Sequence, residues 1–288
     1  MNKRRWLNIG LLVLVSLLGL WAWYEGRDTA LPPRSLTTLA PATVNKIEIV
    51  RRDHGNIILT GQGDDWWLTK PVRIPASRFR VESILGLLAA DSLAQFPVAG
   101  KDLAAFDLAD PALRVRYNNT ELQFGGMTPV DQRRYVRVGD TVHLIVDSYS
   151  LDLMADAPEF ASRNLVPTQQ RITSLATPAF QLEQGADGKW LVEPAGYGLS
   201  ADEIQAVIEK WQHAQAVKVA LYQSAPARGT VTLALAGQQG ALRYEITSEE
   251  PEWVLARPEV GLEFHLSAEQ GRQLFRPAAN HEKASPEL

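Results

Sequence analysis

The hydrophobic and polar positions of the chain form three successive patterns: a long apolar run, a short irregular stretch, and a long region of short alternating runs. The apolar run covers residues 6–24 and contains no charged residue. At 1.5 Å per helical residue it would span roughly 28 Å, close to the roughly 30 Å hydrocarbon core of a bilayer. We therefore predict a transmembrane helix over residues 6–24.

Charged residues on either side of the run set its predicted orientation. Residues 3–5 are basic, whereas residues 25–28 carry a net negative charge. Because basic flanks stay in the cytoplasm, we expect residues 1–5 there and the body in the periplasm, anchored in the inner membrane by a single pass. A cleaved signal peptide is the alternative, but it needs small residues at a cleavage site, and Ala22 lies between bulky aromatic residues.

The segments on either side of the body lack a regular pattern. Residues 25–43 are rich in Pro, Ser and Thr, which is typical of an extended linker, although the same composition also suits irregular coil packed on the body. We predict that residues 277–288 form a flexible tail. The sequence contains no Cys, so the part between them must fold on its hydrophobic core without disulfides.

An internal repeat organises the body. The segment WLTKP at residues 67–71 matches WLVEP at residues 190–194. After each match a Ser, at Ser77 and Ser200, precedes apolar residues at the spacing of an amphipathic helix, and Glu203 completes a capping box in the second copy. The predicted buried stripes are Val81, Ile84, Leu85 and Leu88 in the first copy and Ile204, Val207, Ile208 and Trp211 in the second.

Short β-rich runs separated by Gly, Asn and Asp turns flank both predicted helices. They divide the body into two tandem units, residues 44–166 and 167–276. The predicted fold class is α+β: an N-terminal transmembrane helix followed by two repeats, each a mainly antiparallel sheet covered by one long amphipathic helix.

The sequence carries no recognisable catalytic, phosphate-binding or metal-binding motif. Its five histidines are never paired at ligand spacing, and its net charge of −4 does not favour nucleic acid as a partner. Acidic pairs such as Asp64 with Asp65 and Asp107 with Asp110 suit turns better than acid–base chemistry. We therefore predict no enzyme activity, no cofactor and no metal site.

Aromatic and basic residues of the predicted strands are the candidates for contact with a partner. Trp67 and Trp190 match across the repeat and are predicted core anchors. Trp66 then points to the opposite face, where the other unit covers it or a partner contacts it. Alternation along a later strand places two arginines and a tyrosine on one face, which is solvated or binds a partner. The predicted contact residues are Trp66, Arg133, Tyr135, Arg137 and Trp253.

Four segments, residues 64–96, 102–115, 122–145 and 160–167, contain a Trp strand with a helix, a Phe-Asp-Leu-Ala-Asp-Pro segment, a Gly-rich turn with a Tyr-Val-Arg strand, and a final Ser-Arg-Asn segment. Together they resemble the bacterial family called domain of unknown function 4340, over residues 44–240. Phe-Asp-Leu at residues 106–108 stands where Tyr-Gly-Leu is usual. The resemblance implies structural motifs without a catalytic role, and a gene context beside ABC transporters of the gliding-motility type.

These observations predict a membrane-anchored, extracytoplasmic, non-catalytic accessory protein associated with an envelope complex of the ABC-transporter type. The alternative is a module that binds an envelope glycan or lipid, with an exposed aromatic residue or a groove between the units. A hydrolase is the third and weakest hypothesis. The sequence leaves the identity of the partner and the oligomeric state open.

Overall fold

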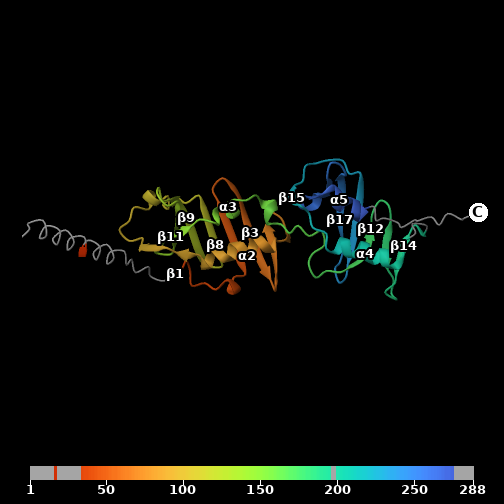
Figure 1. The fold of residues 1–288 in the computed structure, drawn as a ribbon, viewed down its shortest axis with the longest axis horizontal. Coiled ribbons are helices and arrows are strands. Elements are labelled where there is room, and N and C mark those ends of the chain that lie inside the picture. The colour runs from red at the N-terminus through yellow and green to blue at the C-terminus, as the bar shows by residue number, and fades with distance from the viewer. Residues whose placement is uncertain (1–15, 18–33, 196–198, 276–288) are drawn as a thin grey trace, which may run out of the picture.

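The computed structural model describes residues 16–17, 34–195 and 199–275. They form two large antiparallel sheets that follow one another along the chain (Figure 1), together with one two-stranded antiparallel sheet. The first sheet has nine strands, in the order β5 (Ile74–Pro75), β4 (Asp65–Lys70), β3 (His54–Gln62), β2 (Lys46–Arg51), β8 (Leu113–Tyr117), β9 (Thr120–Met127), β10 (Arg133–Val138), β11 (Thr141–Val146) and β7 (Ala94–Pro97).

The second sheet has eight strands, and their order repeats that of the first sheet from β4 to β7. In both units the helix comes after the first three strands of the sheet, with the two-residue β5 inserted before it in the first unit, and the next strand of that sheet along the chain lies at the far edge. The order is β14 (Trp190–Glu193), β13 (Gln181–Gln184), β12 (Ile172–Ala176), β16 (Gly229–Leu235), β17 (Ala241–Ser248), β18 (Trp253–Arg257), β19 (Leu262–Leu266) and β15 (Lys218–Leu221).

The helices are short. The longest among the described residues is α4 (Ala201–Gln212), with 12 residues. The others are α2 (Arg78–Gly86), α3 (Ser150–Leu153) and α5 (Ala268–Phe275), with 3-10 turns η1 (Pro41–Thr43), η2 (Leu87–Ala89), η3 (Leu103–Phe106), η4 (Ala157–Phe160) and η6 (Pro258–Val260).

The predicted fold class, with each sheet covered by one long helix, is therefore wrong. Strands dominate both units, and α2 has only nine residues before the chain tightens into η2 after Gly86. Glycine is a poor helix former, because its backbone loses more freedom than that of other residues when it becomes helical. The short helices α3 and η4 contact α2, and η4 also contacts β15 of the second sheet.

The predicted transmembrane helix is corrected as well. None of the helices in the part of the chain that the structure describes is both long and apolar enough to cross a bilayer. Residues 6–24 lie outside the described residues, apart from Ser16 and Leu17, as do residues 1–5 and 277–288.

The predicted linker, residues 25–43, is described from Arg34 onward, and this part packs on the first unit. Strand β1 (Arg34–Ser35) pairs with β6 (Asp91–Ser92). The next residue, Leu36, is 2% exposed and its backbone amide donates to the carbonyl of Ala90 at 2.8 Å. The end of the segment thus contributes an apolar side chain to the core.

The repeated helices begin as their sequences predict. Ser77 Oγ accepts a hydrogen bond from the amide of Arg80, and Ser200 forms the predicted capping box with Glu203. The predicted stripe of α4 is buried along its whole length, and in the first unit Leu85 is half-buried while Val81, Ile84 and Leu88 are buried. The capping box is therefore confirmed.

The tryptophan assignment is wrong in the first unit because of a β-bulge. Leu59 pairs with Leu68, but Ile58 pairs with Lys70, so one extra residue lies in β4. An extra residue reverses which face the preceding side chains point to. Trp66, not Trp67, consequently packs against the core, as Trp190 does in the second unit.

A buried segment joins the two units. The amide of Leu165 donates to the carbonyl of Ala214 at 3.0 Å, and the amide of Ala216 donates to the carbonyl of Arg163 at 2.7 Å. The phenol of Tyr244, inside the second unit, donates to the carbonyl of Leu165 at 2.6 Å. Since Leu165 is 1% exposed, the apolar core continues from one unit into the other.

Candidate functional site

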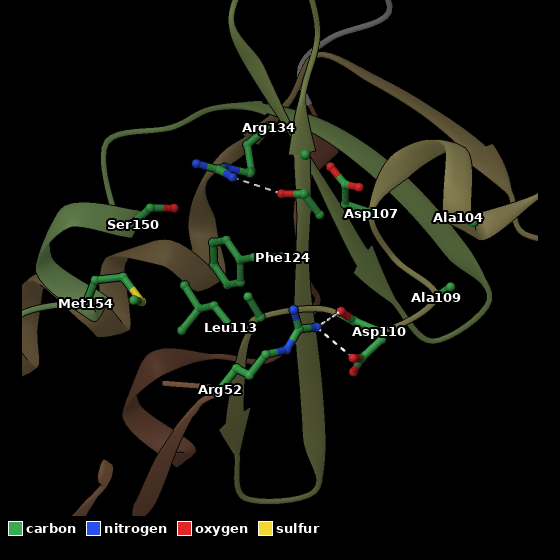
Figure 2. A pocket seen from close by; sticks show the side chains of 13 residues that line it. Arg52, Ala104, Asp107, Ala109, Asp110, Leu113, Phe124, Arg134, Ser150 and Met154 are labelled. Carbon is green, nitrogen blue, oxygen red and sulfur yellow. Dashed lines mark hydrogen bonds and ion pairs between the residues drawn. The ribbon is translucent and has the colours of Figure 1, made fainter. Parts of the chain in front are cut away.

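A pocket of about 620 Å³ opens at one end of the first unit (Figure 2). Its floor consists of Leu113 and Phe124 from neighbouring strands, and Met154 closes one side. Arginines lie at opposite ends of this apolar floor, with carboxylates from the loop after η3 on the facing wall. The polar lining residues are Arg52, Asp107, Asp110, Arg134 and Ser150.

Both arginines of this pocket already have partners. Arg52 Nη2 lies 2.7 Å from Asp110 Oδ2 and also donates to the carbonyl of the same residue. Arg134 Nε lies 2.7 Å from Asp147 Oδ2, and Arg134 Nη1 donates to the carbonyl of Gly125 at 2.8 Å. Burial raises the pKa of Asp147, but hydrogen bonds from Ser150 and Arg134 outweigh this effect, so that its pKa is lowered overall. Asp147 thus links Arg134 of β10 to the start of α3, whose Ser150 amide also donates to its carboxylate.

The glycines of β9 explain why a 3-10 turn can lie against the sheet here. A Cβ on Gly125 would collide with the carbonyl oxygen of Phe106 and with Leu108. A Cβ on Gly126 would collide with the carboxylate of Asp107. Asp107 itself has φ of 55°, the left-handed region that glycine adopts most easily. Asp107 therefore has the backbone conformation that favours glycine, which is the residue usual at this position in the Tyr-Gly-Leu pattern of the family that the sequence resembles.

Aromatic contacts also fix the position of this turn. The rings of Phe106 and Tyr135 have centroids 4.9 Å apart, and those of Phe96 and Phe106 are 5.4 Å apart. Three separate motifs, the Phe-Asp-Leu turn, the glycine pair and the Tyr-Val-Arg strand, thus meet at one place. Their contacts are those of a packing arrangement, and Tyr135 belongs to it.

The other predicted contact residues do not gather around one site. Arg133 Nη2 lies 3.7 Å from Asp131 Oδ2, and Arg137 Nε donates to the carbonyl of Gly139 at 2.8 Å. Trp253 is 5% exposed, with its ring stacked on that of Phe275 at 4.3 Å, so a partner does not reach it in this conformation. Trp66 lines a different cavity, the cleft between the two units.

That cleft has a volume of about 670 Å³. One wall comes from β4 and the first turn of α2, and the other from the chain that connects the units and from two loops of the second unit. Arg80, in the first turn of α2, forms ion pairs with Asp152 of α3 and Glu159 of η4.

Two histidine contacts can be compared with catalytic geometry. Ser92 Oγ lies 2.9 Å from His143 Nδ1, but the two residues are 8% and 6% exposed and line neither cavity. Burial lowers the pKa of His143. His265 lies at the matching place in β19, between Glu252 and Glu263, at 2.8 and 3.1 Å. A nucleophile and its base need access to substrate, which the Ser92–His143 contact lacks.

Among the described residues no group of three or more His, Asp or Glu side chains could hold a metal ion.

Comparison with known proteins identifies the family. A family model described as a domain of unknown function (DUF4340) matches residues 66–235. The chain belongs to this family. The resemblance seen in the sequence is thereby confirmed. Neither the curated proteins nor the solved structures contain a match to the chain.

The DUF4340 match begins in β4 and ends with β16, so both sheets extend beyond the matched segment. It contains the turn, the glycines and the strand that meet beside the first pocket. The arginines at Arg52 and Arg134 and the cleft residues around Arg80 were not predicted as site residues. Their partners are distant in sequence, for example Asp152 for Arg80, and no local pattern signals such a pair.

Proposed function

We propose that this DUF4340 protein is a non-catalytic, extracytoplasmic accessory protein that docks on an envelope complex of the ABC-transporter type. The observation that supports docking is a set of exposed apolar side chains in or near the segments that line the first pocket, with exposed fractions from 36% to 89%. We call this group the apolar end of the first unit. Its members are Met127, Val130, Val146, Leu151 and Met154.

Backbone contacts keep the apolar end together. Met127 and Val146 pair with Arg134 and Arg133, which are successive residues of β10, so both lie at the same end of the sheet but their side chains point from opposite faces. Asp147 Oδ1 then accepts hydrogen bonds from the amides of Tyr149 and Ser150, which begin α3 and position Leu151. Exposed apolar side chains that cluster are typical of protein interaction sites, whereas scattered ones are normal on any surface.

Affinity purification in mild detergent tests the docking role. The tagged full-length chain should recover subunits of a transporter-type complex. A Val130→Asp, Leu151→Asp double variant should lose them, because burying a carboxylate in an apolar interface is costly. Leu191→Asp is the matched control, since Leu191 is 63% exposed in β14 of the other unit. Recovery of the chain alone, or equal recovery with the double variant, would contradict the proposal.

A further inference from the structure

The cleft between the two units combines aromatic surface with amide groups. Its volume of about 670 Å³ lies within the roughly 300–1,000 Å³ of small-ligand sites. Trp66 and Trp67 of β4 line it together with Phe79 of α2, while several side-chain amides come from the connecting segment and from the second unit. Such sites usually consist of an apolar surface with a few placed polar groups.

Phe79 is the most exposed aromatic residue of the cleft, at 74%. The core side of α2 is filled by Val81 and Ile84, so Phe79 makes no contribution to the buried stripe. Nearby, the guanidinium carbon of Arg73 lies 4.9 Å from the centre of the Trp67 ring, a cation–π contact that covers one face of this ring. Phe79 is therefore the aromatic side chain of this wall with the most surface left for a ligand ring.

The polar lining of the cleft combines neutral amides with charged groups of both signs. The amides of Gln169, Gln215 and Gln238 form no side-chain hydrogen bond with any described residue, and each carries both donors and an acceptor. Arg80 is 17% exposed and committed to Asp152 and Glu159. A ligand with hydroxyl and amide groups, which also donate and accept, matches this lining.

Charge and backbone geometry argue against other ligands. Asp64, Asp65, Asp152 and Glu159 offset the arginines that line the cleft, so no positive field is left to attract a polyanion. An extended peptide would add to an open strand edge. The outer side of β5 is closed, because the amide of Ser162 donates to the carbonyl of Pro75 at 2.8 Å.

We propose that the cleft binds a neutral oligosaccharide that carries N-acetyl groups. The sugar rings pack on Phe79 and the Trp67 side of the cleft, and the acetamido groups bond the glutamine amides of the opposite wall. This site is distinct from the apolar end of the first unit, so the proposals of oligosaccharide binding and of docking can be tested independently.

Calorimetric titration of the full-length chain with N-acetylchitotetraose tests the proposal. We expect saturable binding of N-acetylchitotetraose. Cellotetraose, which lacks N-acetyl groups, should bind at least fivefold more weakly. Phe79→Ser should lower the affinity for N-acetylchitotetraose at least tenfold. Leu191→Ser, which changes an exposed apolar residue outside the cleft, should leave this affinity unchanged. Because both side chains are exposed, both variants should fold, and circular dichroism would verify this.

A second pair of variants tests the opposite wall. Gln215→Ala should weaken binding severalfold, and Gln239→Ala, an exposed glutamine that does not line the cleft, should not. Absence of saturable binding to N-acetylchitotetraose overturns the proposal, as does equal affinity of wild type and Phe79→Ser. Equal affinity for cellotetraose overturns the N-acetyl preference. Each of these results leaves the recovery of a transporter complex as a separate question.

Discussion

At the scale of single residues, close approach and burial decide which side chains are tolerated. Gly125 lies directly beneath the Phe106 carbonyl, and Trp253 is covered by Gly271 of α5. The sequence alone does not show these close approaches, because Phe106 and Trp253 lie well away along the chain from the glycines that they contact. In the same way the extra residue in β4, which exchanges the roles of Trp66 and Trp67, is invisible in the repeat.

Replacing Gly125 by Ala should destabilise the protein by about 1–3 kcal/mol, because the new methyl group must displace the Phe106 carbonyl or the Leu108 side chain. Gly86→Ala is the matched control. Gly86 has helical φ and ψ in α2 and no atom within 4 Å of the place that a new methyl group would take, so this change should stabilise by roughly 0.5–1 kcal/mol. Urea unfolding measures both. Equal and small effects would show that η3 does not pack on β9.

His143 gives the unfolding free energy a dependence on pH. Burial lowers its pKa from 6.5, so below pH 6.5 the unfolded chain binds a proton that the folded chain does not. Stability is therefore full above about pH 6.5 and falls on acidification, by at most about 1.4 kcal/mol per pH unit. In His143→Gln this slope should be reduced, whereas the exposed His54→Gln should retain it. An unchanged slope in His143→Gln, measured by chemical unfolding between pH 5 and 7, would refute the assignment.

At the scale of elements, the hydrophobic pattern predicted where the repeated helices begin and which side of them is buried. It did not predict their length or their neighbours, since α2 packs against α3 and η4 through contacts distant in sequence, such as the ion pair of Arg80 with Asp152. The order of the strands was also beyond the pattern, because antiparallel pairing between β2 and β8 joins segments separated by a helix and an edge strand.

The capping box of α4 provides a prediction at this scale. Ser200→Ala removes the oxygen that accepts from the amide of Glu203 and should cost about 1 kcal/mol of stability. Ser148→Ala, at an exposed serine before α3, should change stability by less than about 0.5 kcal/mol. Thermal unfolding followed by circular dichroism compares the two. Identical midpoints would mean that the cap contributes nothing to the folded state.

At the scale of the whole molecule, two units with one strand order are joined through the buried segment around Leu165. The cleft exists only because these units meet, so neither repeat considered alone predicts Arg80 or the glutamines as neighbours. The apolar end belongs to the first unit only. The two units thus share a strand order but have different surfaces. This is expected when the strands determine the fold and the loops determine the contacts with other molecules.

The central claim is that the apolar end of the first unit contacts a partner complex, and site-specific photo-cross-linking in cells tests it most directly. A photoreactive amino acid at Val130 or Leu151 should give adducts that mass spectrometry identifies as transporter-type subunits. The same group at Leu191 in the second unit should give none. Absence of adducts at Val130 and Leu151, or the same adducts at all three positions, would contradict the account.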